Sequence, residues 1–233
     1  MLSVNFKNVE NKAEGIAVDE IFPGGGTASS LNAGTTSASA DKIMIYTNDG
    51  NGGGDYSTYF LYKAAKSSAK DYWWVNSSGN LSGLKFKNGD SFWFYRRGNT
   101  SVTATVSGEV ELTATTNVTL QTGYNMIGNY FPTGLVLNDS TYTASFWQTS
   151  GASAGATSAS ADKVMVYANN GSGGGDYVTY FLYKAAKSSS KDYNWVNSSG
   201  TVVNTSVADP GQGVWYYHRG TGMTLPLHMP ASN

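Results

Sequence analysis

Residues 33–79 of this chain occur a second time, as residues 154–200. The two segments align at a constant offset of 121 without a gap, and 38 of the 47 positions are identical. Several of the differences exchange residues of one physical class, such as Ile43 for Val164. A chain that repeats itself this closely is expected to form one folding unit twice.

The similarity extends past this segment with one residue inserted, so that Asn88–Gly98 matches Pro210–Gly220. Each unit then has roughly 110 residues, a common size for a domain and far longer than the repeats of solenoids or propellers. Gly108 is the natural turn between the units. We therefore predict a first β-domain over residues 1–108 and a second over residues 109–233.

The apolar residues follow the two-residue period of β-strands. Lys42–Tyr46 and Tyr56–Lys63 are rich in β-branched and aromatic residues, and the glycine-rich loop between them is typical of a long hairpin. Leu135–Gln148 is expected to supply further strands, and no segment carries a sustained helical period. The pattern predicts an all-β fold of two tandem homologous domains, each a β-sandwich or a small barrel.

Both ends of the chain read as alternating strands. The apolar side chains that share one face of each strand are Leu2, Val4 and Phe6 at the start and Met223, Leu225 and Leu227 at the end. Neither strand has an obvious hairpin partner beside it, and an unpaired strand exposes a row of backbone donors and acceptors. Two alternatives stay open. Each strand pairs within its own chain, or it pairs with a neighbouring molecule and places these side chains at an interface.

The composition narrows the class of partner. The formal net charge is −1, so the chain has no bias toward nucleic acid or anionic lipid. Only 13% of the residues are charged, which is about half the usual share and common in exported bacterial β-proteins and assembled coats. No apolar run approaches the roughly 18–20 residues that span a membrane. We expect no nucleic-acid partner and no membrane insertion.

The glycine-rich loops Asn48–Asp55 and Asn169–Asp176 offer oxygen ligands on a flexible backbone, as Ca²⁺ requires. The candidate ligands are Asp49, Asn51, Asp55 and Asp176. Their spacing does not match the loop of an EF-hand, so a hairpin tip is the simpler interpretation. With no cysteine, the chain has neither disulfides nor thiolate metal sites. We therefore expect no cofactor.

Catalytic residues are scarce. His218 aligns with Arg96, so the units share no histidine, and no serine lies in a nucleophile-elbow motif. Three aspartate positions recur at turns or strand starts, where this residue commonly caps backbone amides: Asp41 with Asp162, Asp55 with Asp176, and Asp71 with Asp192. Acid–base work would need folding to bring two carboxylates together. We do not expect an enzyme.

Tryptophans are the most informative side chains. Two positions recur in both units and are expected in the cores, Trp74 with Trp195 and Trp93 with Trp215. Trp73 does not recur, because Asn194 takes its place, and alternation points it away from Trp74. An exposed tryptophan is a candidate for an interface or for stacking on a sugar.

The second unit begins with GYNMIGNYFP and ends with PGQGVWYYHR, and it resembles the GWNLIGNPFP…PGQGFWVRR-type repeat module of exported bacterial surface proteins. It matches through Gly123, Asn125, Ile127, Gly128, Asn129, Phe131 and Pro132, and then through Pro210, Gly211, Gly213, Trp215 and Arg219. The first unit keeps Gly89, Trp93 and Arg97, and only Phe22-Pro23 of the opening. The resemblance implies a surface or extracellular structural β-module without a defined catalytic activity.

Together these features predict a structural, self-assembling bacterial protein at the cell surface or outside the cell. It would be a subunit of a filament, coat or surface layer, with itself as partner and with terminal strand exchange as one way of joining. The alternative is a carbohydrate-binding or adhesive surface module whose partners are glycans.

Overall fold

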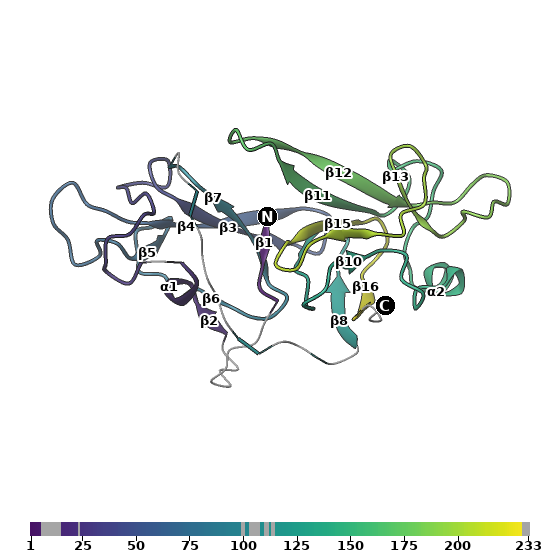
Figure 1. Cartoon of the computed structure of the whole chain (residues 1–233), viewed down its shortest axis with the longest axis horizontal. Coiled ribbons are helices and arrows are strands. Elements are labelled where there is room, and N and C mark those ends of the chain that lie inside the picture. Colours follow the sequence, from purple (N-terminus) through teal and green to yellow (C-terminus); the bar gives the residue numbers. More distant parts are fainter. Residues whose placement is uncertain are drawn as a thin grey trace.

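The computed structural model describes residues 1–5, 15–22, 24–98, 101–102, 108–109, 112 and 115–229. Nearly all regular structure in these residues is β, which confirms the predicted all-β class. Figure 1 shows an elongated molecule in which the two units lie next to each other along the long axis.

Each unit is built on a five-stranded antiparallel sheet. In the first unit the order is β1 (Leu2–Ser3), β7 (Ser91–Tyr95), β3 (Lys42–Asn48), β4 (Gly54–Leu61) and β5 (Trp74–Asn76). In the second unit it is β9 (Gly123–Ile127), β15 (Val214–His218), β11 (Lys163–Asn169), β12 (Gly175–Leu182) and β13 (Trp195–Asn197). The strand order is therefore the same in both.

The register of the strands is repeated as well. Met44 lies between Thr58 and Trp93 in the first sheet. Its counterpart Met165 lies between Thr179 and Trp215 in the second. A shift of one residue would turn every apolar side chain to the opposite face, so the shared pattern of alternation holds both sheets in one register.

Smaller two-stranded sheets cover the large ones. β2 (Ile16–Ala17) pairs with β6 (Lys85–Phe86), and β10 (Leu135–Val136) pairs with β14 (Ser206–Ala208). In the second unit, β8 (Thr115–Leu120) also pairs with β16 (Met223–His228). The apolar side chains of β8 and β16 join the core below β9 and β15, which makes this unit a β-sandwich.

Two short helices accompany the sheets, α1 (Val18–Ile21) and α2 (Ala144–Thr149). The prediction that Leu135–Gln148 forms only strands is therefore wrong for its second half. The Thr143 hydroxyl caps α2 by accepting from the Phe146 amide at 3.2 Å, and Trp147 is buried. Six residues are too few for a helical period to stand out in a sequence. Among the described residues, no helix is long and apolar enough to cross a membrane.

The two terminal strands pair within their own chain. Leu2 lies opposite Phe92, so β1 forms an edge of the first sheet. β16 pairs with β8 along its whole length. The opening of the first unit is thus β1, and not the segment around Phe22, which lies in the core after α1. Pro23 and Phe6 fall outside the described residues.

Leu225→Ala tests the placement of the last strand. Leu225 is buried in the core of the second unit, whereas Thr224 is exposed on the other face of β16. The substitution should lower the free energy of unfolding by about 2–5 kcal/mol, the usual cost of a leucine cavity. Thr224→Ala should change it by less than about 0.5 kcal/mol. Equal effects in urea unfolding would contradict the pairing of β16 with β8.

Candidate interaction site between the two units

The recurring buried aspartates cap the chain. Asp41 accepts hydrogen bonds from the backbone amides of Asn32 at 2.9 Å and Arg97 at 2.6 Å, and it forms an ion pair with the Arg96 guanidinium. In the second unit, Asp162 accepts from the Arg219 amide at 2.8 Å. These carboxylates tie each closing strand to the start of the hairpin in their own unit.

The cation beside this carboxylate differs between the units. His218 takes the place of Arg96 and is fully buried, with Nδ1 2.8 Å from Asp162. The Tyr216 hydroxyl lies 3.1 Å from the same carboxylate oxygen. Burial lowers the pKa of His218. The hydrogen bond to Asp162, the negative charge of Asp162 and the hydrogen bond to the Thr221 carbonyl all raise this pKa, and together they hold it above its ordinary value.

A second recurring pair caps a loop. Asp71 accepts from the amides of Ala64 at 2.8 Å and Ser68 at 3.3 Å. Asp192 makes the same two contacts in the second unit, with Ala185 and Ser189. The structural role predicted for these aspartates is thereby confirmed, whereas Asp55 and Asp176 are exposed on β4 and β12.

The glycine-rich loops are hairpin tips that use their own oxygens. Asp49 accepts from the amides of Asn51 at 2.7 Å and Gly53 at 3.0 Å. Asn170, the counterpart of Asp49, makes equivalent bonds in the second loop. Within the described residues, no group of three His, Cys, Asp or Glu side chains could hold a metal ion.

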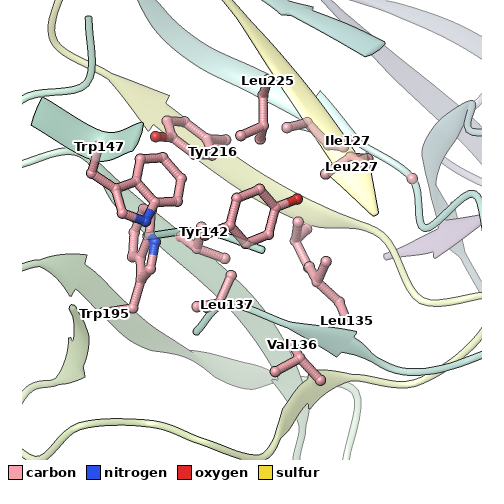
Figure 2. Close-up of a pocket in the computed structure, with 13 residues that line it drawn as sticks. Ile127, Leu135, Val136, Leu137, Tyr142, Trp147, Trp195, Tyr216, Leu225 and Leu227 are labelled. Carbon is pink, nitrogen blue, oxygen red and sulfur yellow. The ribbon is translucent and has the colours of Figure 1, made fainter. Parts of the chain in front are cut away.

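An apolar cavity lies inside the second unit, where the rings of Tyr142, Trp147, Trp195 and Tyr216 meet leucines of β10 and β16 (Figure 2). Its volume is about 30 Å³, roughly that of one water molecule and far below a typical ligand pocket. The indole nitrogens of Trp147 and Trp195 are buried, and within the described part of the chain they have no hydrogen-bond partner. The cavity is a feature of core packing and leaves no room for a substrate.

The units meet through aromatic side chains that recur in both. Trp215 of the second unit lies 5.0 Å from Tyr46 and 6.5 Å from Tyr56 of the first, between ring centroids. In the reciprocal contact, the ring of Trp93 of the first unit lies 4.8 Å from Tyr167 and 6.4 Å from Tyr177 of the second, again between ring centroids. Both pairs have edge-to-face geometry, which aromatic rings favour.

The backbones also meet reciprocally. The Ser3 amide donates to the Gly211 carbonyl at 2.8 Å, and the Gly128 amide donates to the Gly89 carbonyl at 3.0 Å. A Cβ on Gly128 would lie 2.4 Å from that carbonyl oxygen, so glycine is needed at this position, whereas the equivalent Ser3 makes its bond with a side chain present. Equivalent residues therefore contact each other in both directions, as in the isologous interface of a two-fold symmetric dimer.

Trp93 and Trp215 were predicted to lie in the cores. Trp215 is buried, although it lies outside the core cluster of its unit, whereas Trp93 is only half-buried, so the prediction is wrong for Trp93. Phe92 and Phe94 of β7 pack into the first core, so strand alternation places Trp93 on the opposite face. That face meets the other unit. Trp74 and Trp195, in contrast, are core residues with only 1% of their surface exposed.

The predicted interface residues are divided between core and surface. Leu2 and Trp73 are exposed, at 40% and 37%. The remaining described ones pack in the cores of their own chain: Val4, Met223, Leu225 and Leu227. These four side chains can reach another molecule only if their strand leaves its present partner, which restricts a surface role to Leu2 and Trp73.

The tyrosines of the contact between the units were missed, although Tyr46 and Tyr56 recur as Tyr167 and Tyr177 on strand faces that the cores do not use.

The opening motif of the second unit has a structural explanation. Asn125 is buried, and its side-chain amide donates to the Gln121 carbonyl at 2.8 Å and the Gly123 carbonyl at 3.0 Å. Asn129 accepts from the Phe131 amide at 3.1 Å. These asparagines shape the chain on either side of β9.

Comparison with family models, with curated proteins and with solved structures gave no match.

The pair of His218 and Asp162 predicts a stability that depends on pH. The pKa of His218 is raised in the folded state. The stability that the pair contributes is therefore complete below the pKa of an unfolded histidine, near 6.5, and is lost as pH rises through the pKa of the folded state. The melting temperature should therefore fall from pH 6 to pH 9. His218→Gln should flatten this slope and cost about 3 kcal/mol at pH 6, because it leaves the Asp162 charge without a cation. Parallel slopes for the two proteins would refute the assignment.

Proposed function

We propose that this protein is a structural subunit that assembles with copies of itself through the open edges of its strands. The observation that carries the proposal is the pairing of β4 and β12. β5 pairs only with Tyr59–Leu61 of β4, and β13 only with Tyr180–Leu182 of β12. The first halves of both strands extend beyond these partners, and no further strand pairs with them in the described part of the chain.

Such an edge is a template for another strand. The side chains on it support association, since Tyr56, Tyr177 and Val178 are all exposed. Neither half-strand carries a lysine or a proline, which commonly protect an edge, and each carries one exposed charge, that of Asp55 or Asp176. With a net charge of −1, the surface also adds little repulsion between copies.

The proposed setting is a filament, coat or layer at a bacterial cell surface or outside the cell, without catalytic activity of its own. The support is the motif shared with exported surface modules, whose asparagines and glycines organise β9, and the low share of charged residues. If a terminal strand is exchanged between subunits, it must first leave β7 or β8, its partner within the chain.

A second candidate function is recognition of carbohydrate at Trp73. Its ring is partly exposed and packs beside Gly26, where a Cβ would lie 2.9 Å from the indole nitrogen. A flat indole held in this way offers a stacking face for a sugar ring. Quenching of tryptophan fluorescence by a glycan, present in the wild type and lost in Trp73→Ala, would favour this function.

Val178→Lys tests the assembly. A lysine at the open edge of β12 should oppose addition of another strand, so the amount of large particles seen by light scattering and negative-stain microscopy should fall by about tenfold or more. Ser198→Lys adds the same charge in an exposed loop and serves as the control. A wild-type protein that stays monomeric at high concentration would overturn the proposed function, as would unchanged particles in Val178→Lys.

A further inference from the structure

Two cations and a tyrosine form a cluster on the second sheet, on the face opposite to the buried Val164 and Tyr216. Lys163 of β11 stands opposite Tyr217 of β15, and Arg219 follows directly after the end of β15. The centre of the Tyr217 ring lies 5.0 Å from Lys163 Nζ and 5.1 Å from Arg219 Cζ. Both distances are within the range of a cation–π contact. One ring therefore holds two positive charges near each other.

The first unit has the same cluster. Lys42 stands opposite Tyr95, and the centre of the Tyr95 ring lies 5.3 Å from Lys42 Nζ and 4.6 Å from Arg97 Cζ. The closing segments 88–98 and 210–220 are identical at only five of their 11 positions, and the tyrosine and the arginine of the cluster are two of these five. The cluster is thus retained where most of the segment has changed.

The four cations have no negative partner. None of them forms an ion pair with a carboxylate of the described residues. Asp162 accepts from the Arg219 backbone amide, but its side chain is buried and paired with His218. Arg219 Nε donates to the Ala161 carbonyl at 2.9 Å, which orients the guanidinium. Its two terminal amino groups have no hydrogen-bond partner within the described part of the chain and are free to bind an anion.

The two charges of the second cluster act on each other. Burial and then the positive charge of Arg219 lower the pKa of Lys163. Like charges held together in this way destabilise each other, whereas an anion between them is attracted by both. The electrostatics of the cluster therefore favour a negatively charged ligand.

The side chains of the cluster indicate the chemical class of this ligand. An arginine guanidinium donates two parallel hydrogen bonds to a carboxylate, and a lysine ammonium adds a point charge. Beside the cations, the Tyr124 ring packs edge-to-face on Tyr217, with 4.7 Å between the ring centroids, and it is 37% exposed. An exposed aromatic ring offers a stacking face for a sugar. The site thus combines donors for a carboxylate with a surface for a sugar ring.

We infer that Lys163, Arg219 and Tyr124 bind a sugar that carries a carboxylate, as a uronate unit of an acidic polysaccharide does. The guanidinium and the ammonium hold the carboxylate, and the sugar ring lies against Tyr124. Lys42 and Arg97 form a second site for such a carboxylate on the first unit. The inference goes beyond the proposed function, because it concerns a ligand of the single chain and requires neither an open strand edge nor self-assembly.

The test uses the whole chain and an oligogalacturonate labelled with fluorescein at its reducing end, followed by fluorescence anisotropy. Saturable binding is expected at about 50 mM salt, and about 500 mM salt should weaken it by about tenfold, because exposed charges are screened. The same oligomer with methyl-esterified carboxylates is the matched control. It should bind at least about tenfold more weakly, since it has lost the charge that pairs with both cations.

Variants of the second site are made in a chain that already carries Arg97→Gln, so that only one site contributes to the signal. Arg219→Gln and Lys163→Gln should each weaken binding by about tenfold, because each removes a hydrogen bond between charged groups. Arg219→Lys keeps the charge but not the planar pair of donors, so its affinity should fall between those of the arginine and the glutamine.

Two controls separate this site from the rest of the surface. Lys191→Gln removes a lysine whose Nζ donates to the Gly200 carbonyl at 2.8 Å, and it should leave the affinity within about twofold. Trp73→Ala should also leave it within about twofold, because Trp73 is not part of the cluster. A circular dichroism spectrum like that of the wild type shows that each variant is folded.

Absence of binding to the oligogalacturonate would overturn the inference, as would equal binding of the esterified oligomer or unchanged binding in the chain with both Arg97→Gln and Arg219→Gln. Equal binding of a poly-glutamate peptide would overturn the assignment to a sugar, because the carboxylate alone would then be recognised. The comparison of the two oligomers uses the wild-type chain, so it is decisive whether or not a variant folds.

Discussion

The rest of the molecule depends on the contact between the two units that Trp93 and Trp215 make. Each indole leaves its own sheet on the face opposite to the core and packs edge-on against a tyrosine of the other unit, Tyr167 or Tyr46. Backbone hydrogen bonds at Ser3 and Gly128 and the side chain of Asn48 join the units beside these rings. The reciprocal contacts join two independent cores into one elongated body.

The isologous arrangement has a consequence for assembly. A two-fold contact uses the same surface on both partners and closes on itself, so a pair joined in this way cannot extend through that surface. Here the pair is one chain, and further growth must use other surfaces. The open first halves of β4 and β12 are such surfaces. Their backbone groups are directional and can add a strand without unfolding either core.

The departures from symmetry are as informative as the symmetry. The tip of the first hairpin is held by Asn48 against the start of β9, whereas Asn169 at the second tip is exposed. The buried carboxylate is paired with Arg96 in one unit and with His218 in the other. One unit therefore has an arginine at this position, and the other has a histidine whose pKa its partners hold above the ordinary value.

Much of the fold could be predicted from the sequence, because strand alternation and the repeat are local signals. The all-β class, the hairpins and the capping aspartates follow from them. The helix α2 could not be predicted, since its six residues show no period. Alternation does place Trp93 opposite Phe92 and Phe94, but it cannot show what covers the tryptophan. That cover comes from Tyr167, which lies 74 positions away in the sequence, and only the packing of one unit on the other brings it there.

A double-mutant cycle on Tyr46 and Trp215 tests the central claim most directly. Tyr46→Leu, Trp215→Leu and the double variant are compared with the wild type by the free energy of unfolding in urea. If the units are joined through these rings, the cycle gives a coupling of about 0.5–1.5 kcal/mol, the range for an edge-to-face pair. Strictly additive effects, within about 0.3 kcal/mol, would show that the rings do not interact and would contradict the account.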